Sequence, residues 1–123
     1  WMHQNKADYT NTFCYLMNKY NQKNEIYNEK VFSLWKKKWE DRIKLNNNSK
    51  EESLKIMNKV NPLIIPRNHL VEEALNHSIE TNDFKKIHEL IRVLQNPYDI
   101  NPLTFDYQST PSLEKNFVTY CGT

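Results

Sequence analysis

The chain has 123 residues, of which 38% are hydrophobic and 26% charged, and its formal net charge at pH 7 is +2. This composition predicts one folded domain or a piece of one and excludes wholesale disorder. The weak positive charge gives no reason to expect a nucleic-acid partner, because such proteins usually carry a concentrated basic stripe. No stretch approaches the ~20 apolar residues of a membrane span, so we expect no membrane partner.

Helical periodicity dominates the first sixty residues. Asp8 is placed to cap a helix whose apolar residues recur in steps of three and four from Tyr9 to Tyr20. A second helix is expected within residues 28–45, where five apolar side chains share a ~120° arc and should be buried: Val31, Phe32, Trp35, Trp39 and Ile43. A capping box of Ser49 and Glu52 begins a third helix, which Asn61-Pro62 ends.

Two further helices follow. Pro66 fits the first turn of the fourth helix, and Asp83 is placed to cap the fifth. The spacing predicts one buried stripe on each helix. The stripe of the fourth helix is Leu70, Val71, Ala74, Leu75 and Ile79, and that of the fifth is Phe84, Ile87, Leu90, Ile91 and Leu94.

No sustained helical period follows residue 97. Pro97, Pro102 and Pro111 favour an extended arm laid over a surface, and "NFVTY" is compatible with one short strand. The aromatic residues of the arm are expected to anchor it: Tyr98, Phe105, Tyr107, Phe117 and Tyr120. The predicted fold is therefore all-α, with about five helices in residues 1–97 and an extended C-terminal arm in residues 98–123.

Several kinds of site are not indicated. The only glycine is Gly122, so neither a Walker-type loop nor a G-x-G-x-x-G loop exists, and this chain alone cannot build a nucleotide site of those kinds. His69, Glu73 and His77 share one helical edge, but an i to i+8 spacing spans ~12 Å, too far for one metal ion. We therefore expect no metal site and no cofactor bound by this chain.

The "WKKKW" segment interleaves aromatic and basic side chains, a pattern that serves stacking and phosphate contact in single-strand binders. Trp35 and Trp39 nevertheless lie on the same arc as Phe32, so core packing explains them more simply. We accordingly expect no nucleic-acid partner.

The densest motif is "NPLIIPRNHLVEEAL". Its prolines fix the backbone around a short apolar link, and its polar side chains can hold a helix N-terminus or contact a neighbouring element. We interpret it as a buttressed helix entry. The residues of this structural motif are Asn61, Pro62, Pro66, Arg67, Asn68, His69 and Glu72.

The two cysteines differ in their surroundings. Cys14 lies in the middle of the first predicted helix and is most simply a packing residue. Cys121 lies two residues from the end of the chain, beside Gly122. The residues alone favour an inert tail cysteine.

Taken together, these segments resemble the C-terminal end of the SelO family, called YdiU in bacteria. The resemblance runs through "ADYTNTF", the spacing of Trp35, Trp39 and Arg42, "NPLIIPRNHLVEEAL" and the closing "YCGT". The "NPLIIPRNH" block and the terminal "CGT" are its most specific parts. The chain opens with Trp1 ahead of Met2, and we expect a processed chain or a fragment whose N-terminal part is missing.

The resemblance implies a protein-kinase-like fold in the parent protein, of which this chain would be the C-terminal helical part. It also implies transfer of AMP from ATP, with Mg²⁺, to hydroxyls of protein substrates. The family's nucleotide-binding and metal-binding residues lie upstream of the matched region, so no catalytic residue maps onto this chain. The bacterial cytoplasm or the mitochondrion would be the compartment.

The resemblance gives Cys121 a possible role. In many animal members of the family the antepenultimate residue is selenocysteine, and Cys121 occupies that position. It would then be a redox-active tip, paired with a cysteine of the missing part rather than with Cys14. The alternative to an adenylyltransferase fragment is a stand-alone helical protein-interaction module without catalysis.

Overall fold

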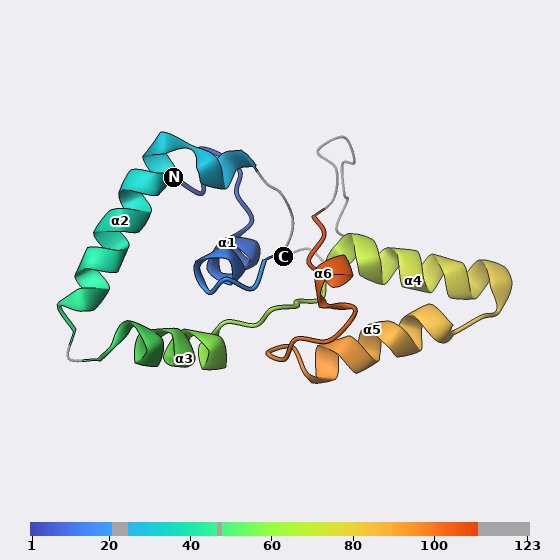
Figure 1. The fold of residues 1–123 in the computed structure, drawn as a ribbon. Helices are drawn as coiled ribbons and strands as arrows, with labels where there is room; N and C mark the ends of the chain where they lie inside the picture. Colours follow the sequence, from blue (N-terminus) through green and yellow to red (C-terminus); the bar gives the residue numbers. More distant parts are fainter. Residues whose placement is uncertain (21–24, 47, 111–123) are drawn as a thin grey trace. The chain divides into compact units, whose positions relative to one another are not determined.

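A computed structural model describes residues 1–20, 25–46 and 48–110 of the protein (Figure 1). These residues form α-helices and one 3₁₀-helix, η1, and the described part of the chain contains no strand, which confirms the all-α prediction. The elements are α1 (Tyr9–Leu16), η1 (Glu25–Asn28), α2 (Lys30–Lys44), α3 (Lys50–Val60), α4 (Asn68–Thr81), α5 (Lys85–Gln95) and α6 (Thr104–Tyr107). The chain divides into two compact units, Trp1–Pro62 and Leu63–Thr123.

The first helix begins as predicted and ends earlier. The Asp8 carboxylate accepts a hydrogen bond from the Asn11 N–H at 2.7 Å, which satisfies a donor of the first turn. The expected helix to Tyr20 is wrong, because α1 ends at Leu16 and Asn18 adopts a left-handed conformation with φ 56°. The Lys19 N–H then bonds the Cys14 carbonyl at 2.8 Å, which completes a Schellman-type end.

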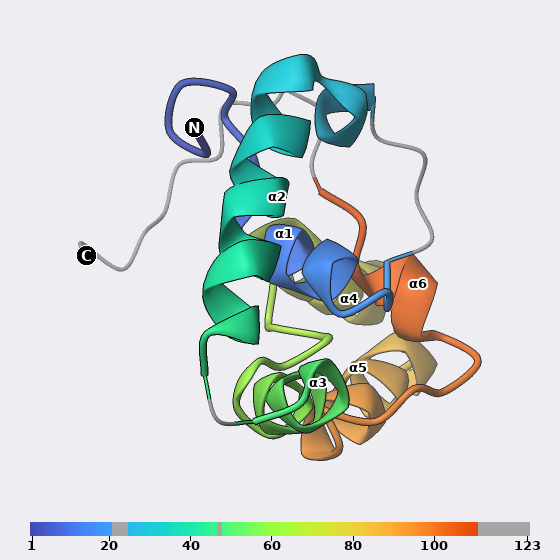
Figure 2. The same cartoon turned by 60° about the vertical axis from the view of Figure 1, so that its left-hand side comes forward.

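An aromatic cluster forms the core of the first unit. Phe32 is 1% exposed and Tyr27 3% exposed, and Leu16 completes the buried centre. The Tyr15 ring stacks on Tyr27 with 4.3 Å between centroids, and Trp1 lies 4.6 Å from Phe32. Figure 2 shows η1 beside the N-terminal end of α2, which brings Tyr27 to Phe32. Burial of these large rings stabilises this unit, because each removes a large apolar area from water.

The predicted buried stripe of α2 is largely wrong. Only Phe32 is buried, Trp39 and Ile43 are half-buried, and Val31 and Trp35 are 62% and 41% exposed. The physical reason is that α2 packs chiefly against η1 and α3, which cover a narrow part of the arc. Trp35 instead stacks along its own helix, with its ring 5.9 Å from Phe32 and 6.5 Å from Trp39.

The limits of α3 follow the sequence. The Ser49 hydroxyl accepts from the Glu52 N–H at 3.1 Å, and the Glu52 carboxylate accepts from the Ser49 N–H at 2.7 Å. The predicted capping box is therefore present. At the other end Asn61 is extended, with φ −107° and ψ 110°, as expected for a residue before proline.

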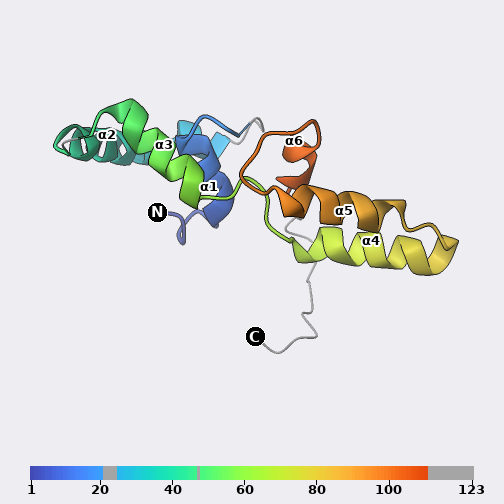
Figure 3. The same ribbon diagram turned by 90° about the horizontal axis from the view of Figure 1, so that it is seen from below.

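In the second unit α4 and α5 run antiparallel and side by side (Figure 3). The prediction that Pro66 lies in the first helical turn is wrong, because α4 begins at Asn68 with Arg67 as its N-cap. Leu63 and Ile64 explain the difference, since both donate their N–H groups to the Pro97 carbonyl and hold the chain out of the helix. The N-cap of α5 is Phe84 and not the predicted Asp83, although the Asp83 carboxylate, one residue earlier, accepts from the Lys85 N–H at 2.9 Å.

The predicted stripes of α4 and α5 are only partly buried. Ala74 of α4 and Leu90 of α5 are buried where the two helices face each other. Four residues expected in the core are instead about half exposed or more: Leu75, Ile79, Phe84 and Ile91. Two helices that pack as a pair cover only their facing sides, so residues at the flanks of each stripe stay in contact with solvent.

The described part of the C-terminal arm is not wholly extended, because it contains the short helix α6. Asn101 explains this difference: its side-chain oxygen accepts from the Leu103 N–H at 2.9 Å, and its own N–H bonds the Thr104 hydroxyl at 2.8 Å. Thr104 and Gln108 are fully buried. Phe117, Tyr120 and the possible strand "NFVTY" lie outside the described residues, and the boundary at residue 97 stays a prediction.

No helix in the described ranges is both long enough and apolar enough to span a bilayer.

We predict that Phe32→Ala lowers the free energy of unfolding by about 3–5 kcal/mol, because it leaves a cavity at the centre of the aromatic cluster. Leu34→Ala is the matched control on the same helix, where the side chain is 55% exposed, and should cost less than about 1 kcal/mol. Urea denaturation measures both. Equal losses for the two variants would show that Phe32 is not the centre of this core.

Candidate functional site

The "NPLIIPRNH" motif surrounds the entry to α4. Its first two residues, Asn61 and Pro62, close the first unit, and the rest opens the second. The Leu63 and Ile64 side chains are each 1% exposed. Leu63 is fixed through its backbone, because its N–H donates to the Pro97 carbonyl at 2.7 Å and its carbonyl accepts from the buried Gln108 side chain at 3.2 Å.

Arg67 is the charged residue of this motif that is buried. It is 8% exposed, and its carbonyl accepts from the N–H groups of Leu70 and Val71, both at 3.0 Å. His69 and Glu72 are half-buried, whereas Pro66 and Asn68 are exposed. A charged side chain is seldom this buried in a folded protein, so Arg67 has a structural place at the entry to α4.

The histidine edge of α4 is engaged in ordinary surface contacts. Glu73 forms an ion pair with Lys86 of α5 at 2.6 Å. Across the described ranges, no group of three or more His, Cys, Asp or Glu side chains is arranged to hold a metal ion.

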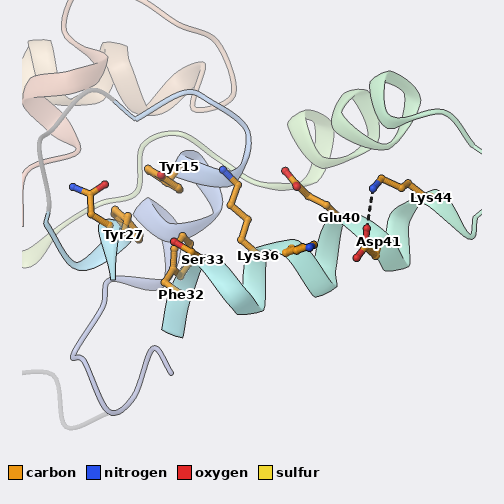
Figure 4. Close-up of a pocket in the computed structure, with 10 residues that line it drawn as sticks. Tyr15, Tyr27, Phe32, Ser33, Lys36, Glu40, Asp41 and Lys44 are labelled. Atoms are coloured by element: carbon orange, nitrogen blue, oxygen red, sulfur yellow. Dashed lines mark hydrogen bonds and ion pairs between the residues drawn. The ribbon is translucent and has the colours of Figure 1, made fainter. Parts of the chain in front are cut away.

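An open groove of about 570 Å³ lies along α2 of the first unit (Figure 4). Its floor is aromatic, with Tyr15 stacked on Tyr27, and Lys36 places its ammonium group 5.1 Å from the centre of the Tyr15 ring. That separation allows a cation–π interaction. The lining residues are Tyr15, Tyr27, Asn28, Phe32, Ser33, Lys36, Lys37, Glu40, Asp41 and Lys44.

Sequence reasoning missed this groove. Tyr15 and Tyr27 lie on either side of the segment between α1 and η1, and no period relates them. In the sequence Lys36 and Lys37 belong to "WKKKW", whose pattern does not indicate an aromatic floor beside them. The aromatic floor arises because η1 returns to α1, which is a tertiary contact that leaves no local signal.

The hydroxyl of Tyr27 is held in the interior. It lies 3.1 Å from the Thr12 hydroxyl, within hydrogen-bond distance. Burial raises the pKa of Tyr27 to about 12, although the hydrogen bond to Thr12 acts in the opposite direction. At neutral pH this phenol is therefore uncharged, which suits packing and not base catalysis.

The charges of the groove are mixed. Lys44 pairs with Asp41 at 2.8 Å, and this hydrogen bond lowers the pKa of Asp41 and raises the pKa of Lys44. Glu40 lies 3.6 Å from Lys50 of α3. These pairs are exposed, so each contributes little to stability. The groove therefore presents charges of both signs and an aromatic floor, with no concentrated positive surface.

A smaller groove of about 190 Å³ lies between α4, α5 and α6 of the second unit. The Tyr107 hydroxyl donates to the Glu89 carboxylate at 2.8 Å. Burial, followed by this hydrogen bond, raises the pKa of Tyr107 to about 12. The bond connects α6 to α5, so it helps fix the C-terminal segment on the helix pair.

Cys14 has the place expected of a packing residue. It is completely buried, and its thiol points to the Pro62 carbonyl at 3.7 Å. Cys121 lies outside the described residues.

Comparison with known proteins decides the family. Residues 1–95 match the family model for the protein adenylyltransferase SelO, which is more than half of the chain. The chain belongs to the SelO family. The resemblance noted in the sequence is thereby confirmed, although the match to the family model ends before the C-terminal arm.

Curated relatives match nearly the whole chain. A protein nucleotidyltransferase YdiU of Pelagibacter ubique is 41% identical over 124 residues, which cover 100% of this chain and 26% of that protein. One of Clostridium botulinum is 43% identical over 119 residues, covering 96% and 24%. The chain therefore spans about a quarter of the length of these relatives. No solved structure matches it.

We predict that alkaline pH destabilises the protein through Tyr27 and Tyr107. Both have a pKa of about 12 in the folded chain against the ordinary 10.0. As the pH rises, the unfolded chain therefore loses these protons before the folded chain does. The contribution of the two tyrosines to the free energy of unfolding is fully present below pH 10 and is lost as the pH rises toward 12. Urea denaturation at stepped pH should show this fall, and it should be smaller in a Tyr27→Phe/Tyr107→Phe variant. An unchanged pH slope in that variant would contradict the assignment.

Proposed function

We propose that this chain is the C-terminal part of a SelO-type protein adenylyltransferase, which transfers AMP from ATP to Ser, Thr or Tyr hydroxyls of proteins. The observation that carries the proposal is the match of residues 1–95 to the SelO family model. The relatives that cover the whole chain are named protein nucleotidyltransferases, in agreement with this chemistry.

The proposal assigns the chemistry to the part of the protein that lies outside this chain. The chain spans about a quarter of its relatives, and its single glycine, Gly122, cannot form a phosphate-binding loop. ATP and Mg²⁺ would be bound upstream, and the helices described above would support the catalytic part. Its partners are therefore that catalytic part and the protein substrates.

The full-length gene product should transfer AMP to protein. With Mg²⁺ and ATP labelled on the α-phosphate, label should enter a protein substrate or the enzyme itself, whereas ATP labelled on the γ-phosphate should leave no label. The comparison separates nucleotidyl transfer from phosphoryl transfer, because only the α-phosphate stays on the protein in the first case.

Two results would contradict this proposal. Label from the γ-phosphate alone would make the parent a kinase. A natural gene product without a glycine-rich loop and without any transfer would instead favour the stand-alone helical interaction module.

We further propose that Cys121 is a redox-regulatory thiol of the parent protein. Its thiolate would attack a low-molecular-weight disulfide such as oxidised glutathione, forming a mixed disulfide and releasing one reduced thiol. A cysteine of the catalytic part would then displace the second thiol and close a protein disulfide. Cys14 is a poor partner, because it is fully buried in α1.

Alkylation of the two cysteines tests this role. We expect Cys121 to react with iodoacetamide at least about tenfold faster than the buried Cys14, and its rate should titrate with an apparent pKa below the ~8.5 of a free cysteine. Peptide mass spectrometry across a pH series measures both rates in the full-length protein. Titration of Cys121 like a free thiol would leave it an inert tail cysteine.

A further inference from the structure

The hairpin formed by α4 and α5 exposes more apolar surface than a covered helix pair should. Four large apolar side chains are 46%, 80%, 50% and 49% exposed, and we call them the hairpin apolar face: Leu75, Ile79, Phe84 and Ile91. Their placement together in contact with water therefore marks an interaction surface.

The four side chains lie on one side of the hairpin. Glu73 of α4 and Glu89 of α5 both line the small groove beside α6, which marks the other side. Leu75 and Ile91 each follow one of these glutamates by two residues, which is about 200° around the helix axis. They therefore project from the side opposite the small groove.

The remaining two residues extend the same face toward the connection between the helices. Ile79 lies one turn beyond Leu75, and Phe84 precedes Ile91 by seven residues, which is two turns. Because α4 and α5 are antiparallel, Ile79 and Phe84 lie at the connected end. Ile87 of α5, one turn beyond Phe84, is half-buried and adds to the apolar centre.

We propose that this face docks an apolar segment of the same polypeptide, contributed by the part of the family protein that this chain lacks. The proposal rests on the proposed function, since it requires the longer parent protein. About three quarters of the length of the curated relatives lies outside this chain, so the occupant would come from there. A covalently connected segment also has a millimolar effective concentration, which favours it over a second copy of the chain.

The chemistry of the face defines the occupant. The centre carries no charge, and its edge is polar. Half-buried Glu72 of α4 and exposed His88 of α5 each point about 160° away from the buried residue two positions later, Ala74 or Leu90, and so lie beyond the apolar residues. An apolar centre with a polar edge is the arrangement of a protein–protein contact. The docked segment should therefore present aliphatic or aromatic side chains with polar residues around them.

Cysteine labelling in the full-length gene product tests the docking. Ile79→Cys places a thiol at the most exposed position of the face. Glu80→Cys is the matched control, because it is exposed on the next residue of α4 and points about 100° away. The rate of alkylation at each position, divided by its rate in urea, is read by peptide mass spectrometry. We expect Cys at position 79 to be protected at least about tenfold more than Cys at position 80.

A photoactivatable cross-linker attached at position 79 identifies the occupant. Cross-linked peptides from outside these 123 residues support the proposal. Equal labelling at positions 79 and 80, or cross-links only to residues of this chain, would overturn it. Protection that disappears on dilution to a monomer would assign the face to a second copy and would also overturn it.

The docking and the activity are read separately. AMP transfer is measured on the same preparations with ATP labelled on the α-phosphate. Protection at position 79 in a parent protein that never transfers AMP would keep the docking and sink the adenylyltransferase function. Transfer of AMP without protection at position 79 would support the adenylyltransferase function and contradict the docking.

Discussion

The first unit depends on the burial of two rings, Phe32 and Tyr27, which are almost completely removed from water. They belong to elements that have little else to hold them, since η1 is four residues long and α2 packs on a narrow side. The phenol of Tyr27 meets the Thr12 hydroxyl at 3.1 Å, so the buried polar atom keeps a partner. Without this cluster, α1, η1 and α2 would have no common interior.

The second unit is organised by backbone hydrogen bonds at the entry to α4. The Pro97 carbonyl accepts from both Leu63 and Ile64, and Gln108 donates to the Leu63 carbonyl. Two segments distant in sequence, at Pro97 and at Gln108, are thereby fixed against one short extended stretch that leads into the helix pair. The "NPLIIPRNH" motif therefore has a structural explanation in its apolar residues as much as in its polar ones.

Membership of the SelO family and the exposed hairpin apolar face both concern how this chain relates to the rest of a longer protein. The chain spans about a quarter of its curated relatives, and its helices bury only part of each apolar stripe. Helices that belong to a larger protein keep some of their apolar surface for neighbouring segments. The catalytic part that we propose for the parent would then carry out the AMP transfer, and these helices would support it.

The sequence by itself determined the helical class and several helix limits, because caps are local. Asp8, the Ser49–Glu52 box and Asp83 each satisfy a donor within three residues, and Asn61-Pro62 ends α3 by steric restriction. It also indicated the family and the absence of a glycine loop. Tertiary structure alone decided which apolar residues are covered, since periodicity defines an arc and not its neighbour. It likewise decided the tyrosine–lysine groove of α2 and the return of Gln108 to Leu63, because contacts between distant segments leave no pattern in the chain.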